Sequence, residues 1–173
     1  AALKPIKEWS VDVPAPDDFK NHHVEVDAPA LPLGHYALLC ASDSQFRLPS
    51  QAIAYNTVQV SRLSYIERRK INGKQEFLVL DREMGAPLKG VAAKVWSRTY
   101  DDKSRAYTLV PKGTYTTDKN GLVIIGASIN SYESCVVEFS LSHDRLRAGG
   151  EFYLYPMSVP AKNMTPRTYF FTD

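Results

Sequence analysis

The sequence predicts an all-β protein built from two β-sandwich units in tandem, and three observations predict it. Short runs of apolar, β-branched and aromatic residues recur along the chain, and several alternate with polar residues as a half-buried strand does. No stretch of about a dozen residues keeps its apolar positions at the spacing of an amphipathic helix. The 9 Gly and 11 Pro among 173 residues fall mostly between the apolar runs, where a sandwich has its turns.

The N-terminal part of the chain is expected to hold about four strands, the clearest of which alternate polar and apolar side chains. These clearest runs are residues 23–27, 34–39 and 57–63. Prolines crowd the beginning of the chain, at Pro14, Pro16, Pro29 and Pro32. Because proline cannot donate to a strand ladder, these positions are restricted to edge strands and bends.

The C-terminal part is expected to hold about seven strands, which is enough for a complete sandwich. The runs that predict them include residues 77–80, 91–96, 122–125, 135–139 and 151–155. Asn72-Gly73 and Asn120-Gly121 indicate tight turns, because Asn and Gly both accept a positive φ. The best helical candidate, residues 143–147, amounts to a single turn at most.

We expect the boundary between the two units near residues 60–63. The domains are then residues 1–60, a small or partial β-sandwich domain, and residues 61–173, a β-sandwich domain with its full set of strands. About sixty residues are marginal for an independent hydrophobic core. The first domain is therefore expected to be small, or to be the remaining part of a larger one.

Charge and hydropathy exclude two classes of partner. The 21 Lys and Arg against 19 Asp and Glu leave a formal net charge of +2, with both signs interspersed along the chain. A nucleic acid or an anionic membrane surface would favour a basic patch, so neither is expected as the partner. Residues 68–70 are the one basic run, and a charged hairpin tip beside the Asn72-Gly73 turn accounts for them. No apolar run approaches the ~20 residues of a membrane span, so direct membrane insertion is not expected.

The two cysteines, Cys40 and Cys135, are expected to be free and buried. Both lie within apolar runs, where a thiol packs as a small hydrophobic group. A disulfide-rich secreted domain would need more cysteines at closer spacing, and a zinc site would need paired Cys or His. One long-range bridge between the two expected domains is the alternative.

The sequence holds no residues at the spacing of a metal site. His22 and His23 are adjacent, and neighbouring residues of a strand point to opposite faces, so a solvated pair is the favoured interpretation. The acidic pairs at residues 17–18 and 101–102 lack the spacing and the Gly of an EF-hand loop, so they are interpreted as surface charge. No metal and no cofactor are therefore predicted.

Nor does the sequence predict an enzyme. No serine stands in the G-x-S-x-G turn of a hydrolase, and neither a P-loop nor a G-x-G-x-x-G motif is present. The serines of residues 140–144 lie beside His143-Asp144, but adjacency at the end of a strand is not the geometry of a catalytic triad. The predicted set of catalytic, cofactor-binding and metal-binding residues is empty.

The aromatic residues allow an alternative function. Sugar binding needs exposed aromatic side chains on one face of a sheet, and Trp96, Tyr100 and Tyr107 are the candidates. Core packing accounts for most of the 10 Tyr, 7 Phe and 2 Trp, and we expect Trp9 and Trp96 in, or at the edge of, their cores. The alternative is a ligand-binding or adhesive extracellular module, for a carbohydrate or a protein.

One two-part sequence motif is more specific than the patterns above. Residues 80–91 have the pattern of a strand, a polar turn closed by Gly85, and a return strand with Pro87 at its edge. Residues 117–121 follow as a second tight turn that feeds a core strand. The combined pattern, D-x-x-x-G-x-P-L-x-G-V and then T-D-x-x-G, resembles prealbumin-like and carboxypeptidase-regulatory-like sandwiches.

The flanking segments extend the resemblance. Residues 30–39 are similar to the L-x-x-G-x-Y strand that closes many extracellular β modules, and residues 167–173 are similar to the lead-in of a macroglobulin domain. The order of elements over residues 30–173 resembles the N-terminal-side part of the large bacterial alpha-2-macroglobulin-like proteins. This resemblance implies that both units are immunoglobulin-like or macroglobulin-type β-sandwiches.

The resemblance also implies a function. Members of the family are broad-spectrum protease traps of the cell envelope, in which cleavage of a bait triggers a collapse and, in some, a Cys–Gln thioester tethers the protease. Neither Cys40 nor Cys135 fits the thioester motif. The implied role is that of a non-catalytic structural module of such an endopeptidase inhibitor, excised from a longer chain and unable to inhibit a protease by itself. Its partners would be the neighbouring domains of the same chain, and proteases through the full-length parent, at a periplasmic or cell-surface location with a membrane-anchored parent.

Overall fold

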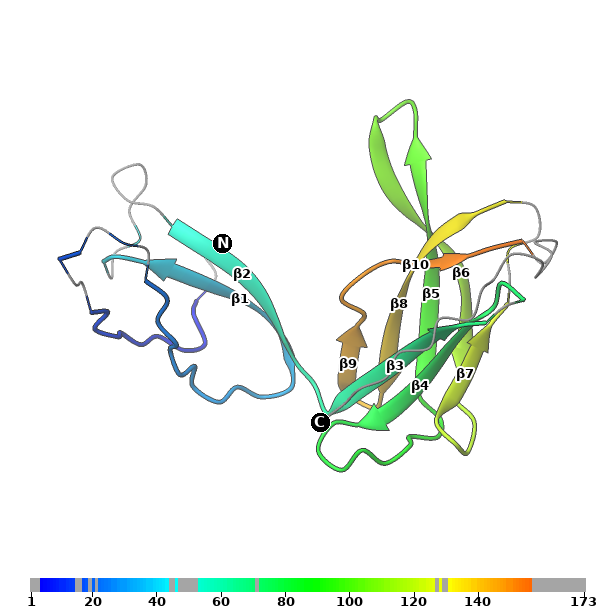
Figure 1. Cartoon of the computed structure of the whole chain (residues 1–173), viewed down its shortest axis with the longest axis horizontal. Coiled ribbons are helices and arrows are strands. Elements are labelled where there is room, and N and C mark those ends of the chain that lie inside the picture. Colours follow the sequence, from blue (N-terminus) through cyan, green and yellow to red (C-terminus); the bar gives the residue numbers. More distant parts are fainter. Residues whose placement is uncertain are drawn as a thin grey trace. The chain divides into compact units, whose positions relative to one another are not determined.

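The computed structural model describes residues 4–14, 17–18, 20, 22–43, 46, 53–70, 72–126, 128 and 131–156 (Figure 1). Chain contacts divide the protein into two compact units, Ala1–Pro32 and Leu33–Asp173. The described residues of the first unit form neither strand nor helix, so the strand predicted over residues 23–27 is wrong. Every regular element of the described residues is a strand, which confirms the all-β prediction.

The second unit begins with a separate antiparallel hairpin of β1 (Gly34–Ala41) and β2 (Ile53–Val60). The strand predicted over residues 34–39 is therefore confirmed. The run predicted over residues 57–63 is divided, because β2 ends at Val60 and the next strand begins after two further residues. Most side chains of the hairpin are exposed or half-buried, and Tyr55 is 79% exposed.

The remaining strands form two antiparallel sheets (Figure 1). The 3-stranded sheet has the order β3-β4-β7, and in the 5-stranded sheet β8 is bordered by β5 on one edge and by both β9 and β10 on the other. β6 pairs with the free edge of β5. The strands are β3 (Leu63–Arg69), β4 (Gln75–Asp81), β5 (Ala92–Asp101), β6 (Ala106–Thr116), β7 (Leu122–Ile125), β8 (Glu133–Leu141), β9 (Asp144–Arg147) and β10 (Phe152–Leu154).

One hydrophobic core joins these two sheets. Alternate side chains of β4, β5 and β8 point inward and are fully buried, as strands with one wet face require. Phe77 of the 3-stranded sheet contacts both Phe139 and Phe152 of the 5-stranded sheet, with ring centroids 5.5 and 5.2 Å apart. The strands from β3 to β10 are therefore a sandwich-like unit packed around a shared core.

The sandwich agrees with the strands predicted in the C-terminal part. The predicted runs 77–80, 122–125 and 135–139 lie within β4, β7 and β8, and the runs 91–96 and 151–155 overlap β5 and β10. The predicted division into residues 1–60 and 61–173 stays a prediction. Its position coincides with the break between the β1–β2 hairpin and β3, while the described residues before Leu63 form no second complete sandwich.

Two strands differ from the sequence-based expectation. Residues 143–147 contain β9 instead of a helical turn, because Asp144 and Leu146 point inward while the residues between and after them are exposed. The β6 strand escaped prediction because Pro111 and Gly113 are typical of turns. Both residues are tolerated there, since β6 is an edge strand and its ladder with β5 shifts register beside them.

Candidate functional site

Asp81 is the last residue of β4 and organises the turn that follows. Its Oδ1 accepts hydrogen bonds from the amides of Glu83 and Met84, each at 3.0 Å. The amide of Gly85 donates to the Asp81 carbonyl at 2.8 Å, and the amide of Asp81 donates to the carbonyl of Ala86. Gly85 has a φ of 67°, which a side chain disfavours. This half of the predicted motif is therefore a turn that the aspartate holds closed.

The second half of the motif packs against the first. The Thr117 hydroxyl accepts a hydrogen bond from the Val91 amide at 2.9 Å and donates to the Leu88 carbonyl at 2.6 Å. Gly121 has a φ of 73°, and its carbonyl accepts from the Val79 amide at 2.8 Å. A Cβ at Gly121 would lie 2.5 Å from the Val79 carbonyl oxygen. The two turns are thus bound to β4 through the backbone, and to each other through both the backbone and the hydroxyl of Thr117.

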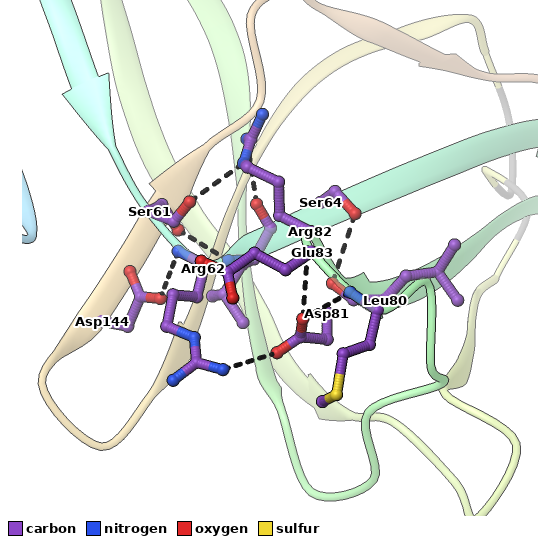
Figure 2. Close-up of polar contacts among 10 residues, drawn as sticks. Ser61, Arg62, Ser64, Leu80, Asp81, Arg82, Glu83 and Asp144 are labelled. Carbon is purple, nitrogen blue, oxygen red and sulfur yellow. Dashed lines mark hydrogen bonds and ion pairs between the residues drawn. The ribbon is translucent and has the colours of Figure 1, made fainter.

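Ser61 and Arg62, which we call the link, connect β2 to β3 and are bound on both sides (Figure 2). The Arg82 guanidinium donates to the carbonyls of Ser61 and Leu63 at 2.9 and 3.0 Å. The Arg82 amide donates to the Arg62 carbonyl at 2.7 Å. One arginine of the turn after β4 therefore holds three successive carbonyls of the chain that enters the sandwich.

Two aspartates hold Arg62 from the other side (Figure 2). The Arg62 amide donates to Oδ2 of Asp144 at 2.9 Å, and its guanidinium contacts Oδ2 of Asp81 at 3.3 Å. The hydrogen bond from the Met84 amide lowers the pKa of Asp81 most, and Arg62 lowers that pKa further, although desolvation opposes both. Oδ1 of the buried Asp144 has no hydrogen-bond partner among the described residues. The contacts of this cluster are to backbone groups and to a neighbouring arginine, so they hold the link to the sandwich.

A second feature, which we call the tyrosine groove, lies where β5 and β6 continue beyond the end of β8. It is an open depression of about 630 Å³. Its aromatic lining consists of Tyr100, Tyr107, Tyr132 and Tyr153, which are 48%, 58%, 54% and 38% exposed. Two of these, Tyr100 and Tyr107, were predicted as candidates for ligand binding, and they pair across β5 and β6 with ring centroids 5.1 Å apart.

The other two tyrosines of the groove, Tyr132 and Tyr153, were not among the candidates predicted from the sequence. Tyr132 precedes β8, and its ring stacks on that of Tyr153 at 5.0 Å with an interplanar angle of 19°. The signal for Tyr153 was its position between the buried Phe152 and Leu154, since alternation turns it to the outer face. Trp96 shares the outer face of β5 but is half-buried and does not line the groove.

Charged groups in and beside the tyrosine groove are paired. The Arg98 guanidinium lies 3.7 Å from the centroid of the Tyr107 ring and donates to Glu151 at 2.6 Å. Lys112 donates to Glu133 at 2.7 Å. Burial acts most strongly on the pKa of Glu133 and would raise it, but the hydrogen bonds from Lys112 and Ser97 outweigh burial and leave that pKa lowered. The groove therefore combines aromatic faces with the Arg98–Glu151 ion pair, and its second carboxylate, Glu133, is paired with Lys112 outside the lining.

The histidines and acidic pairs considered for metal binding include residues that make local contacts within their own segments. His22 contacts Asp18 at 2.7 Å on an exposed segment. Asp101 accepts hydrogen bonds from the Lys103 amide and the Ser104 hydroxyl, which lower the pKa of Asp101 in that order and close the β5–β6 hairpin tip. Within the described part of the chain, no three His, Cys, Asp or Glu residues are grouped as metal ligands.

The serine and histidine neighbours do not form a catalytic arrangement among the described residues. Ser142 and His143 are the exposed turn between β8 and β9, since Leu141 pairs with Asp144. Asp144 is committed to Arg62, as described above. Ser140 is part of the β8 ladder, opposite Arg145.

The basic run is a charged hairpin tip, as expected. Arg68 and Lys70 both pair with the buried carboxylate of Glu76 on the neighbouring strand. The hydrogen bond from Arg68 lowers the pKa of Glu76 most, ahead of an opposing effect of burial and a further lowering by Lys70. Arg69 points elsewhere and lies 4.9 Å from the centre of the Tyr155 ring.

The cysteine and tryptophan expectations are half right. Both thiols are free, and Cys135 is fully buried, but Cys40 is exposed because its hairpin strand has no covering layer in the described residues. Burial raises the pKa of Cys135 to about 11. Trp96 is half-buried as expected, whereas Trp9 is 43% exposed and is not part of the core that the described residues form.

Comparison with known proteins finds no matching family model, no matching curated protein and no matching solved structure. Among the described elements there is no helix that is long and apolar enough to cross a membrane.

Proposed function

We propose that the chain is a non-catalytic structural module of a large bacterial alpha-2-macroglobulin-like protein, in which it positions the domains before and after it. The protease-trap function belongs to the parent in this proposal, and the chain alone does not inhibit a protease. A periplasmic or cell-surface location with a membrane-anchored parent follows from the same proposal. The partners are then the neighbouring domains and, through the parent, proteases.

The order of the strands supports an immunoglobulin-like or macroglobulin-type sandwich. Counted along the chain from β3, the first, second and fifth strands form one sheet, and the third, fourth and sixth lie in the other. Strand crossing of this kind between two antiparallel sheets is typical of immunoglobulin-like folds. Such folds serve many functions, so strand order supports the architecture and leaves the role to be argued from the link.

The observation that carries the proposal is the bound link. Two residues connect β2 to β3, and both are held by side chains of the sandwich. Gln59, near the end of β2, adds two hydrogen bonds with the backbone of Arg147, at 2.8 and 3.1 Å. A flexible connection would leave these backbone groups to water. A connection fixed by these hydrogen bonds suits a module that holds one segment of the chain in a defined position relative to the next.

A distance measurement between spin labels tests this role. One label is attached to the exposed native Cys40 on β1, and the other to Ile124→Cys on the exposed face of β7. We expect one narrow distance distribution in double electron–electron resonance. The change Asp144→Ala removes the acceptor of the Arg62 amide and should broaden the distribution.

The control is Asp101→Ala, which deletes an aspartate of the same hydrogen-bonding kind at the distant β5–β6 tip. It should leave the distribution narrow. Two results would contradict a positioning role: a broad distance distribution in the labelled chain that keeps Asp144 and Asp101, or equal broadening by both alanine variants.

A further inference from the structure

The tyrosine groove is built on a stable frame and lies outside the core. Its tyrosines come from β5, β6, β10 and the segment before β8, so four parts of the chain converge on it. On the opposite face of the same sheet, Phe139 and Phe152 are buried in the core. Core packing therefore does not account for the four groove tyrosines, each of which is more than a third exposed.

The rings are held in place before any ligand arrives. Tyr132 and Tyr153 stack on each other, and Tyr100 and Tyr107 meet edge to face with an interplanar angle of 65°. Arg98 lies over the Tyr107 ring and is itself fixed by Glu151, whose second oxygen accepts a hydrogen bond from Ser134. Because paired rings lose little freedom on binding, such a surface binds with a small entropic cost.

The charges of the groove select against a charged ligand. Glu151 is neutralised by Arg98, and Glu133 by Lys112. Ser97 and Ser134 each donate to one of these carboxylates. The carboxylate oxygens keep a further lone pair each and the guanidinium keeps further N–H groups, so the groove offers acceptors and donors without a net charge.

We propose that the tyrosine groove binds a neutral oligosaccharide. Pyranose rings present apolar C–H faces that pack on aromatic rings, and hydroxyl groups at their rims that both donate and accept hydrogen bonds. The groove offers the matching pair of features, exposed tyrosine faces beside paired carboxylates, serines and an arginine. An anionic polysaccharide would find no unpaired cation among the described residues that line the groove, because Arg98 is already paired with Glu151. This site is independent of the link and adds a ligand to the proposed structural role.

Native electrophoresis in gels that contain a polysaccharide tests the site with the whole chain. The neutral probes are mannan, xyloglucan, mixed-linkage β-glucan, galactomannan and amylopectin, and the acidic probe is polygalacturonate. We expect at least one neutral polymer to retard the protein and polygalacturonate to leave it unretarded. Isothermal titration with the hexasaccharide of the retarding polymer then gives the affinity, which should not change with added sodium chloride.

The variants Tyr100→Ala and Tyr107→Ala should each weaken hexasaccharide binding about tenfold or more, as expected for the loss of a central aromatic contact. Tyr55→Ala is the control, because Tyr55 is also exposed but lies on β2 outside the groove. Circular dichroism checks that each variant keeps its fold.

Three results would overturn the proposal: no retardation by any neutral polymer, retardation by polygalacturonate alone, or equal weakening by Tyr55→Ala. Retardation by a gel of denatured casein that Tyr107→Ala abolishes, without any by neutral polymers, would make the groove a peptide-binding surface instead.

Discussion

Replacing Gly121 with alanine tests whether the motif turns are structural elements packed on β4. Gly121 combines a φ of 73° with a Cβ position only 2.5 Å from the Val79 carbonyl oxygen and 3.0 Å from the Leu88 nitrogen. Neither neighbour is the end of a flexible side chain. The substitution must therefore shift backbone that also carries the hydrogen bond from Leu88 to Val79.

The expected cost has two parts. The left-handed conformation costs a residue with a Cβ roughly 1–2 kcal/mol, part of which is offset because alanine also restricts the unfolded chain. Forcing a methyl group into packed surroundings costs a further ~1–3 kcal/mol. We expect Gly121→Ala to lower the free energy of unfolding by about 3 kcal/mol.

Gly90→Ala is the matched control. Gly90 has a φ of 79°, but a Cβ there meets nothing within 4 Å, so only the conformational part applies. We expect a loss of about 1 kcal/mol. With a urea m-value of about 1.5 kcal/mol/M, the unfolding midpoints fall by about 2 M for Gly121→Ala and about 0.7 M for Gly90→Ala. Equal midpoints for the two variants would refute the close packing of the second turn on β4.

Two further predictions concern titratable groups. A thiol reagent at neutral pH should modify Cys40 at once and Cys135 only after denaturation, because Cys135 is buried and its pKa is raised to about 11; two fast equivalents would contradict the burial of Cys135. The lowered pKa of Glu76 means that its ionised form stabilises the folded state above the ordinary value of 4.5, and that this contribution is lost as the pH falls through the lower folded value. In that acid range, the free energy of unfolding should therefore depend less on pH in Glu76→Gln than in the unchanged chain. If the free energy changes with pH equally in both chains, Arg68 and Lys70 do not hold the carboxylate.

The sequence predicted the sandwich strands better than the site because the two depend on different information. Phe77, Val137 and their neighbours form runs whose burial follows from local pattern, so their strands were found. The strand predicted over residues 23–27 has the same pattern but packs against no second sheet among the described residues, which shows that alternation alone does not make a strand.

Contacts distant in sequence could not be predicted. Asp144 and Arg62 are 82 positions apart, and their meeting depends on the order of strands in the sandwich. The convergence of Tyr132 and Tyr153 with the β5–β6 pair depends on β10 bordering β8. Asp81 and Gly85 were recognised as a turn, but the role of that turn in holding the link required the position of Arg82.

The measurement that tests the central claim most directly is hydrogen exchange at the link, resolved by residue in nuclear magnetic resonance. The amides of Arg62, Leu63 and Arg82 donate to Asp144, Ser61 and Arg62 in turn, at 2.9, 3.0 and 2.7 Å. If the link is part of the sandwich, these amides exchange with the same free energy of opening as the Val79 amide inside β4. Exchange of these three amides at unprotected rates, while Val79 stays protected, would contradict the proposal that this module holds its neighbour through a fixed connection.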